Sequence, residues 1–600
     1  MLGGPHAGCQ GFCEIYLHSP AMRASTTKDG LTLRVVGGTT SVMIGIDLEG
    51  KRRKGCLGFS IRRTDLGPEG QPLTTLARPA FLPNMLRFPS DTSAGPITTE
   101  HAPLQKFRWG DYTTLPHRRY RYQVVPRFGT PAQLLPSPIG DGDGVSVEIT
   151  TEDPASPATS VSFNRAAAAS RAFELEFPTI TTEELLLGNT PQAMDARQWL
   201  SRGLEEAALA FLAKAADKTF ALHAAIYEFQ KPDLLAALKD AIVRGVEVQV
   251  IYHHRQKTLT GGQPDPKDTT AGKNDAAAHA AGLDAVCVKR EADPQDAIMH
   301  DKFVVLLRRV AGSLQPQAVW TGSMNWTDGA IYGQLNVGHA VYEPAVAAIY
   351  EDCFQLLHAD PAEAAQKEAL AKLTPVPSAV PPGHQTTPIL SPQYDLGMLD
   401  LYAGICKTAT CLMVSAPFEL HEKIRQALLN RPAGTVHYLL LDSKKVLGKP
   451  EEVQVQQGDP SNTISVATTL PSPLHDFQGK LLEGHESFLH EGIHIHCKII
   501  LADPFGSDPV LITGSANYSA ASTTMNDENS LLIRGDMAVC DIYVTEFMRM
   551  FEHYHFRASL AAAPGGVTLS LKENDTWSDP YYVPGSIKEL DRHIFAGTLV

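Results

Sequence analysis

The chain of 600 residues has little cysteine and none of the cysteine spacing that a disulfide framework or a zinc ribbon needs. Its nine cysteines are scattered, and no Cys-x-x-Cys pair occurs among them: they stand at positions 9, 13, 56, 287, 353, 406, 411, 497 and 540. An odd, scattered set argues against a disulfide-stapled secreted domain and fits reduced thiols. We therefore expect a cytoplasmic protein.

Long apolar runs are also missing. No stretch reaches the roughly 18 apolar residues that suggest a membrane span, so we expect no integral membrane segment. The N-terminus lacks a basic region followed by an uninterrupted apolar one, which argues against a signal peptide. We expect residues 1–21 to be a disordered extension, and both Met1 and Met22 stay open as the start.

Positive charge is in deficit, with 52 Lys and Arg against 66 Asp and Glu and a formal net charge of −14. Non-specific coating of nucleic acid depends on Lys and Arg that neutralise phosphates, so the balance argues against that role. It leaves room for an enzyme with a locally basic cleft, because electrostatic fields are local. The length and the 43 % of hydrophobic residues favour several ordinary globular domains.

Residues 22–180 contain short runs rich in β-branched residues, separated by Gly, Pro and Asp. Examples are LTLRVVGG, SVMIGIDL and VSVEITTED. The pattern predicts an all-β sandwich. Within it, PLQKFRWGDYTTLPHRRYRYQVVPRFG resembles the strand-and-corner pattern of immunoglobulin or fibronectin type III domains. We expect an accessory domain that binds a partner or mediates dimerisation.

From residue 181 onward, helical and strand patterns alternate, which favours an α/β fold with a mainly parallel sheet. The same order occurs twice. Ala225-Ile226-Tyr227-Glu228 and Ala416-Pro417-Phe418-Glu419 stand at matching strand ends. We expect a first half over 181–365, a Pro-rich linker over 366–390 and a second half over 391–600.

One motif occurs once in each half. His300-Asp301-Lys302 is followed by Gly322-Ser323-Met324-Asn325, and His496-Cys497-Lys498 is followed by Gly514-Ser515-Ala516-Asn517. Residues i and i+2 of a strand share a face, so each histidine should project together with its lysine. Each half then offers an imidazole, an ammonium, a hydroxyl and an amide at strand ends.

Two such halves facing each other would form one catalyst for a phosphodiester. One histidine can attack phosphorus while the other protonates the leaving oxygen. Lysines and asparagines of both motifs can hold the non-bridging oxygens, whose charge grows in the transition state. The scheme requires no metal and no cofactor.

These residues resemble the phospholipase D superfamily, whose HxKx4D…GSxN motif occurs twice in each active site. The resemblance covers roughly residues 185 to 600 and implies two αβαβα half-domains related by a pseudo-twofold axis, preceded here by the β-sandwich. It implies a phosphodiesterase that works through a covalent phosphohistidine. The residues that it marks as catalytic are His300, Lys302, Asn325, His496, Lys498 and Asn517, with Ser323 and Ser515 in support.

The two copies differ in their acidic residues. The second half has Asp503 five residues after its lysine, and Glu528 after its asparagine; the first half has Leu307 and Asn336 at those positions. In the family the acidic position that Glu528 occupies orients the motif histidine, so we expect Glu528 to support His496.

Two explanations of this asymmetry stay open. Either the first half has degenerated and the enzyme is slow or inactive, or the two histidines have different roles in catalysis. In the second case His300 beside an amide stays neutral as nucleophile, and His496 beside a carboxylate acts as general acid. The tyrosyl-DNA phosphodiesterase branch is similarly asymmetric, and we favour this division.

Other candidate residues are explained better by packing than by chemistry. A zinc site from His494 with His253 and His254 is conceivable, but His494 fits better as a packing or cleft-lining residue. We expect Trp326 and Tyr518 to pack in the core and Cys497 to be a buried thiol. The aromatic C-terminal stretch 575–597 should pack across the second half.

Three functions stay open. A nuclease is favoured by MHDKFVVL…TGSMNWT, which looks like the bacterial nuclease branch, and opposed by the net charge. A phospholipase D or phosphatidyl transferase is favoured by the family, but no amphipathic membrane helix is visible. A catalytically lapsed binding protein is the third. We expect a hydrolase acting on nucleic acid, with phospholipid as the alternative substrate.

Overall fold

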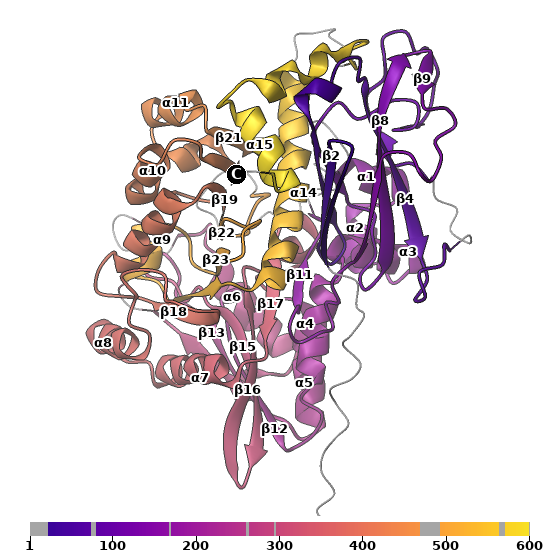
Figure 1. Cartoon of the computed structure of the whole chain (residues 1–600). Helices are drawn as coiled ribbons and strands as arrows, with labels where there is room; N and C mark the ends of the chain where they lie inside the picture. The colour runs from indigo at the N-terminus through magenta and orange to yellow at the C-terminus, as the bar shows by residue number, and fades with distance from the viewer. Residues whose placement is uncertain are drawn as a thin grey trace, which may run out of the picture. The chain divides into compact units, whose positions relative to one another are not determined.

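The structure, a computed structural model, describes residues 22–73, 80–166, 170–259, 263, 265–292, 294, 296–467, 493–562 and 570–598. The expected disordered extension at residues 1–21 lies outside these described residues. Contacts divide the chain into two compact units (Figure 1). The β unit comprises Met1–Glu152, Leu569–Tyr582 and Phe595–Val600, and the α/β unit comprises Asp153–Thr568 and Val583–Ile594.

The β unit is built from antiparallel strands in two main sheets. One sheet has the order β1-β2-β3-β7, formed by β1 (Arg23–Lys28), β2 (Leu31–Gly37), β3 (Val42–Leu48) and β7 (Arg108–Asp111). The other has the order β10-β8-β4, formed by β4 (Gly58–Leu66), β8 (Arg119–Thr130) and β10 (Val145–Thr150), with β9 (Gln133–Leu135) paired to β8. A short pair, β5 (Pro83–Asn84) and β6 (Ile97–Thr98), and the turn η1 (Gly50–Arg52) complete the unit.

Alternation of apolar and polar residues explains why these strands form a common core. Val145, Val147 and Ile149 of β10 are buried while the residues between them are not, which is the period of a strand with one buried face. Residues of both sheets share one apolar cluster. Tyr120 Oη accepts a hydrogen bond of 2.8 Å from the backbone N–H of Leu115, a contact of the kind that fixes a strand corner. The immunoglobulin-like topology stays a prediction.

The aromatic C-terminal stretch lies partly in a different unit from the one predicted. Its aromatic part, the 3₁₀ segment η6 (Asp575–Tyr582), belongs to the β unit. The indole N–H of Trp577 donates to the Cys56 carbonyl at 2.8 Å, and its ring stacks on Phe107 at 5.4 Å. We expected this part to pack across the second half, which is wrong because the apolar core of the β unit takes up its aromatic rings. Only residues 583–594, which contain most of α15 (Ile587–Ala596), group with the α/β unit.

The α/β unit contains two seven-stranded sheets with the same strand order. The first has the order β11-β17-β16-β15-β12-β13-β14, and its strands are β11 (Val161–Phe163), β12 (Phe220–Ile226), β13 (Glu247–His253), β14 (Cys287–Arg290), β15 (Lys302–Val310), β16 (Ser313–Gly322) and β17 (Val337–Val341). The second has the order β18-β24-β23-β22-β19-β20-β21, and its strands are β18 (Gln385–Ser391), β19 (Cys411–Ala416), β20 (Val436–Leu441), β21 (Asn462–Val466), β22 (Ile499–Ala502), β23 (Val510–Gly514) and β24 (Glu528–Arg534).

Each of these sheets is mixed rather than mainly parallel. Only β12-β13-β14 and β19-β20-β21 run parallel, and the remaining neighbours in both sheets are antiparallel. The expectation of a mainly parallel sheet is therefore wrong. Helices connect the parallel strands, whereas the motif strands follow one another as hairpins, and a hairpin makes antiparallel neighbours.

Helices cover the sheets, and their sequences explain where they start and what they bury. In α5 (Pro232–Val243) a proline opens the first turn, and Leu234, Leu235, Leu238 and Ala241 are buried at helical spacing. The other α-helices are α1 (Ser170–Glu176), α2 (Thr182–Leu187), α3 (Pro191–Ser201), α4 (Leu204–Ala213), α6 (Thr270–Ala280), α7 (Pro344–Ala359), α8 (Glu363–Leu373), α9 (Gly397–Thr408), α10 (Glu422–Leu429), α11 (Pro450–Gly458), α13 (Ala520–Thr524) and α14 (Met537–Ala562). Short 3₁₀ segments are η3 (Asp284–Val286) and η5 (Lys444–Leu447), and η4 (Gly329–Gly333) is a short π-helix.

Two predicted boundaries differ from the structure. Strand β11 pairs with β17, so residues 161–163 belong to the first α/β sheet although we placed the sandwich over 22–180. The predicted linker 366–390 contains most of α8 and most of β18. A pseudo-twofold relation between the halves stays a prediction. In the described part of the chain, no helix has both the length and the apolarity to cross a membrane.

Candidate active site

The motif residues of both halves stand where strands of the two sheets begin or end. Lys302 opens β15, and Lys498 immediately precedes β22. Gly322 and Gly514 close β16 and β23, so each serine and asparagine follows directly after a strand. Both histidines are buried, His300 at 1 % and His496 at 0 % exposure. Strand ends thus hold all the motif side chains at defined positions, as the sequence predicted.

Two backbone bridges join the halves beside the histidines. The His300 N–H donates to the Asp527 carbonyl at 2.8 Å, and the Asp527 N–H donates to Ile298 at 3.0 Å. In the same way the His496 N–H donates to the Leu335 carbonyl at 3.0 Å, and the Leu335 N–H donates to His494 at 2.7 Å. Each bridge pairs the residues around one motif histidine with a segment of the other half.

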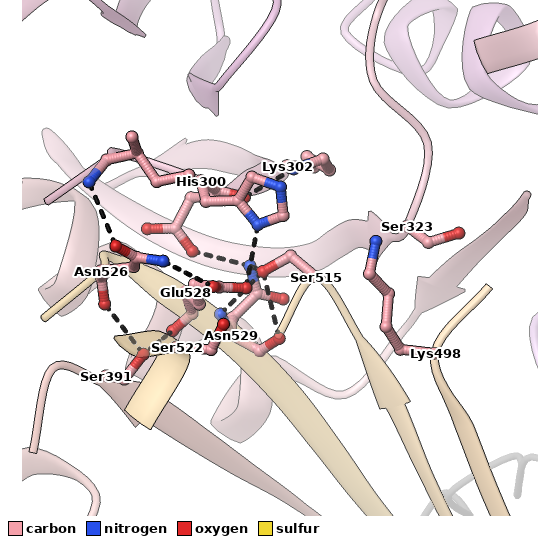
Figure 2. Close-up of polar contacts among 12 residues, drawn as sticks. His300, Lys302, Ser323, Ser391, Lys498, Ser515, Ser522, Asn526, Glu528 and Asn529 are labelled. Carbon is pink, nitrogen blue, oxygen red and sulfur yellow. Dashed lines mark hydrogen bonds and ion pairs between the residues drawn. The ribbon is translucent and has the colours of Figure 1, made fainter. Parts of the chain in front are cut away.

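The first bridge places Glu528 beside His300 and not beside His496. Glu528 Oε2 lies 2.9 Å from His300 Nδ1, and both side chains are fully buried. Figure 2 shows the His300 ring directed at this carboxylate. The expectation that Glu528 supports the histidine of its own half is therefore wrong. The physical reason is the bridge, because Glu528 directly follows the residue that pairs with the His300 backbone.

The second bridge places Asn336 beside His496. Asn336 Oδ1 lies 2.9 Å from His496 Nδ1, and the Ser323 carbonyl lies 3.1 Å from the same nitrogen. The Ser323 hydroxyl also donates to Asn336 Oδ1 at 2.7 Å, while Asn336 Nδ2 donates to Ala330 at 2.9 Å. These partners are acceptors toward the ring, so His496 Nδ1 carries the hydrogen.

The two lysines make different contacts. Lys302 Nζ donates to the His300 carbonyl at 2.8 Å. Lys498 Nζ lies 3.0 Å from His496 Nε2, where an ammonium can only donate. Figure 2 shows Lys498 reaching toward the site from the side opposite Glu528, next to Ser323. Because Nδ1 carries the hydrogen, this contact makes His496 neutral with its Nε2 lone pair occupied by the ammonium.

An aromatic ring supports each histidine and lysine pair. The Tyr227 ring lies 5.0 Å from the His300 ring, edge to face, and 5.1 Å from Lys302 Nζ. Phe418 has the same relation to the second motif, 6.3 Å from the His496 ring and 5.9 Å from Lys498 Nζ. The sequence placed these two aromatics at matching strand ends but gave them no role. An aromatic face beside an ammonium is a favourable cation–π contact.

The motif asparagines differ between the halves. Asn325 Nδ2 donates to Glu228 Oε2 at 2.6 Å, and Glu228 is 1 % exposed. The matching Glu419 has a side chain that is 61 % exposed and lies 4.0 Å from Arg425. Asn517 Oδ1 is buried and has no hydrogen-bond partner among the described residues. Sequence reasoning missed the role of Glu228 at the site, although the Tyr-Glu and Phe-Glu pair at matching strand ends was a usable signal.

Ser515 and Asp301 meet at Asn529, the residue after Glu528. The Asn529 side-chain amide donates to Asp301 Oδ1 at 2.7 Å, and its backbone N–H donates to the Ser515 hydroxyl at 3.0 Å. Burial, helped by the nearby Asp527, raises the pKa of Asp301 to about 7. Burial also lowers the pKa of His253 to about 3, so this histidine stays neutral and accepts from the Met299 N–H at 3.3 Å.

The remaining candidates lie outside the reacting centre. Asp503 follows β22 at the end away from Lys498 and accepts from the backbone of Thr410 and Cys411 at 2.9 Å each, so it anchors the start of β19. Leu307, its counterpart, pairs within β15 and β12.

The predictions for the other aromatic and thiol residues are confirmed. Trp326 and Tyr518 are buried in the two apolar cores, as predicted. Cys497 is a buried thiol that donates to the Leu335 carbonyl. Across the described residues, no group of three or more His, Cys, Asp or Glu side chains is placed to hold a metal ion.

Comparison with known proteins defines the class of this domain. Residues 210–357 match the family described as "Cardiolipin synthase, PLD-like domain", a range that contains the first motif copy. These residues form a phospholipase D-like domain, and the chain's resemblance to the phospholipase D superfamily is confirmed. No curated protein matches the chain in sequence.

Solved structures with local similarity include three enzymes or enzyme-family members. Polyphosphate kinase from Porphyromonas gingivalis is 10 % identical with a TM-score of 0.34, over 54 % of this chain and 45 % of that one. Phosphatidylserine synthase from Haemophilus influenzae is 11 % identical with a TM-score of 0.38, over 59 % and 85 %. Nuc from Salmonella typhimurium, a phospholipase D family member, is 16 % identical with a TM-score of 0.20, over 28 % and 96 %. The chain thus spans less than half of the polyphosphate kinase, and TM-scores this low identify no particular relative.

Proposed function

We propose that the chain is a phosphodiesterase in which His300 and His496 act on opposite sides of one phosphorus atom. The observation that carries the proposal is the crossed support of the two histidines. A carboxylate of the second half faces His300, and an amide of the first half faces His496. Each half therefore completes the catalytic group of the other, and two lysines stand beside the pair.

The crossed contacts keep His300 as nucleophile, but for a reason opposite to the one drawn from the sequence. When Nε2 attacks phosphorus, positive charge builds on the imidazole. Glu528 at 2.9 Å from Nδ1 neutralises that charge, which a neutral amide cannot do. Among the described residues, the acceptors at His496 Nδ1 are the neutral Asn336 amide and Ser323 carbonyl, so its protonated ring gives up the Nε2 proton readily. We therefore assign His496 as general acid.

The first step forms a bond from His300 Nε2 to phosphorus while the bond from phosphorus to the leaving oxygen breaks. When substrate binds, the ammonium of Lys498 turns from His496 Nε2 to a phosphate oxygen, and Nε2 takes up a proton from solvent. The leaving oxygen then takes this proton from His496 Nε2. Lys302, Asn325 and Asn517 hold the non-bridging oxygens. Charge on these oxygens grows in the transition state, so donors placed beforehand lower the barrier.

In the second step a water, or an acceptor alcohol, attacks phosphorus and gives its proton to His496 Nε2. The bond from His300 to phosphorus breaks, and both histidines return to their starting forms. Hydrolysis and transfer differ only in the acceptor. The geometry of the protein groups is the same for both outcomes.

Nucleic acid is the substrate class that we propose first. The motif segments MHDKFVVL and TGSMNWT resemble the nuclease branch. The β unit is less acidic than the rest of the chain, since its segments contain 18 Lys and Arg against 16 Asp and Glu, out of 52 and 66 in the whole chain. A charge balance closer to neutral repels a phosphate backbone less. Cytoplasmic location and a protein partner or dimer contact for the β unit remain proposals.

Phosphatidyl transfer is the second candidate. The family that matches residues 210–357 is described as cardiolipin synthase, a name that belongs to transfer between lipid alcohols. A chain of this function would give a phosphatidyl group to an alcohol in the second step. The same two histidines would act.

One assay with EDTA present tests the proposal. Wild type, His300→Ala, His496→Ala and, as a matched control, His279→Ala on the exposed face of α6 are incubated with plasmid DNA, single-stranded DNA, RNA and phospholipid vesicles. We expect nucleic acid to be cut by wild type and the control only. Cleavage of lipid alone would show that phospholipid, and not nucleic acid, is the substrate. Activity in both active-site variants would reject the mechanism. Inactivity of wild type on all four would favour the lapsed binding protein.

A further inference from the structure

A buried ion pair lies directly behind the residues that support His300. The Arg290 side chain, at the end of β14, is 1 % exposed. Its Nε donates to Asp527 Oδ2 at 3.0 Å, its Nη2 donates to Gln366 Oε1 at 2.9 Å, and its Nη1 contacts Asp360. Gln366 Nε2 donates to Asp527 Oδ1 at 2.5 Å. Both oxygens of the Asp527 carboxylate are thus held by groups from β14 and α8.

Asp527 connects this pair to the catalytic histidine. Its carbonyl accepts from the His300 N–H and its own N–H donates to Ile298, so its backbone forms the bridge between the halves. The next residue is Glu528, whose carboxylate meets His300 Nδ1 and also accepts from Asn526 Nδ2 at 3.2 Å. Figure 2 shows Asn526 and Glu528 side by side beneath the His300 ring. Any movement of the Asp527 backbone would move the His300 backbone and the Glu528 carboxylate relative to each other.

The other bridge has an apolar residue at the position of Asp527. Leu335 occupies the position of Asp527, paired with Ile495 as Asp527 is with Met299, and Leu335 is a buried apolar residue. There a carboxylate acts on the opposite segment, where Asp442 Oδ1 accepts from the N–H groups of His494 and Ile495 at 2.8 and 3.0 Å. A buried pair of Arg549 with Glu546 reaches Asn336 through Asn164, whereas Arg290 contacts the bridge residue Asp527 itself.

We propose that Arg290 and Asp527 are positioning residues that fix the Glu528 carboxylate on His300 Nδ1. This inference rests on the proposed function for its kinetic part. A buried ion pair adds little net stability over an apolar pair, because desolvation offsets much of the attraction. The pair instead fixes the orientation of Asp527, since the planar guanidinium of Arg290 donates hydrogen bonds to its carboxylate at fixed angles. Outer groups of this kind change the activity of the groups they orient by roughly 10- to 100-fold.

The test compares Arg290→Met, Arg290→Lys and Asp527→Asn with wild type, and uses Arg431→Met as the matched control. Arg431 forms a mostly buried ion pair with Asp459 in the same unit, beside α10 and α11, with side chains 9 % and 13 % exposed. Each variant is measured for melting temperature, for kcat and KM on bis(p-nitrophenyl) phosphate, and for the Nδ1–H proton resonance of His300 in protein labelled at histidine. A His300→Ala variant assigns that resonance.

We expect Arg290→Met and Asp527→Asn to lower kcat about 10- to 100-fold with little change in KM, and to lose or shift the His300 resonance. Arg290→Lys keeps the positive charge and should therefore retain part of kcat and part of the His300 resonance. Arg431→Met should lower the melting temperature by a similar amount and leave kcat and the resonance as in wild type.

An unchanged resonance and unchanged kcat in Arg290→Met, with only a lowered melting temperature, would show that the pair is merely structural and overturn the inference. If wild type has no phosphodiesterase activity, the proposed function fails, and the resonance alone decides the positioning of Glu528. A variant that does not fold is replaced in the comparison by Arg290→Lys, whose charge is retained.

Discussion

At the scale of single residues, each motif histidine has its partner in the other half: Glu528 faces His300, and Asn336 faces His496. His300, Lys302, His496 and Lys498 could be found because a motif has local spacing. That Glu528 faces His300 could not be found, since the contact depends on a backbone bridge between segments that are 228 residues apart. Spacing within one half carries no information about which half a side chain faces.

The crossed support predicts an ordering of two variants. Glu528→Gln removes the charge that balances the attacking His300 and should lower kcat about 10²- to 10⁴-fold, between the effect of changing an outer supporting group and that of changing the carboxylate behind a catalytic histidine. Asn336→Asp adds a charge beside the acid His496 and should cost less. The measurement is kcat on bis(p-nitrophenyl) phosphate. The reverse ordering would exchange the roles of the two histidines.

Asp301 predicts a pH dependence of stability. Its pKa is raised from the usual 3.8 to about 7, so between these values the unfolded chain has lost a proton that the folded chain retains. The free energy of unfolding should therefore fall as pH rises from about 4 to about 7, by roughly 4 kcal/mol at most. Asp301→Asn keeps an acceptor for Asn529 and should abolish this part of the dependence. Urea unfolding of both proteins at pH 4, 6 and 8 measures it, and parallel curves would contradict it.

At the scale of elements, strands and helices were predictable wherever the apolar period was clear. The runs FVVLL and IILA form β15 and β22, as expected. Strand direction was missed because the two-residue turn at Ala311 and Gly312, where both residues have positive φ, lacks the Asn-Gly or Asp-Gly sequence that marks a hairpin. The C-terminal aromatics were misplaced because an apolar segment does not specify which core it enters.

The glycines at the ends of β16 and β23 leave no room for a side chain. Gly322 and Gly514 have φ of 145° and 146°, and a Cβ there would lie 2.2 and 2.3 Å from the carbonyls of Val337 and Asn529. Gly514→Ala should therefore lower the free energy of unfolding by about 1–3 kcal/mol and displace Ser515, with loss of activity.

Gly434→Ala is the control for that variant. Gly434 also has positive φ, but a Cβ at that position has no neighbour within 4 Å, so only backbone strain is added. Chemical denaturation and kcat are measured for both. Equal effects on kcat would show that the close approach at Gly514 is irrelevant to the site.

At the scale of the whole molecule, the proposed catalytic site belongs to the two halves together. The backbone bridges, the crossed histidine partners and the Arg290–Asp527 pair all join one half to the other. Repetition of the motif predicted that both halves would be needed. The manner of their connection could not be predicted, because each bridge joins segments that are distant in the chain and have no shared pattern.

The most direct measurement is the capture of the covalent intermediate in His496→Ala with bis(p-nitrophenyl) phosphate. Its leaving group departs without a proton, so the first step should survive the loss of the acid, while hydrolysis, which needs His496 as base, should stop. We predict a burst of about one equivalent of p-nitrophenol and an acid-labile phosphoryl group on His300, located by mass spectrometry of peptides. Turnover without any labelled histidine, or the same burst in His300→Ala with the label on His496, would contradict the account.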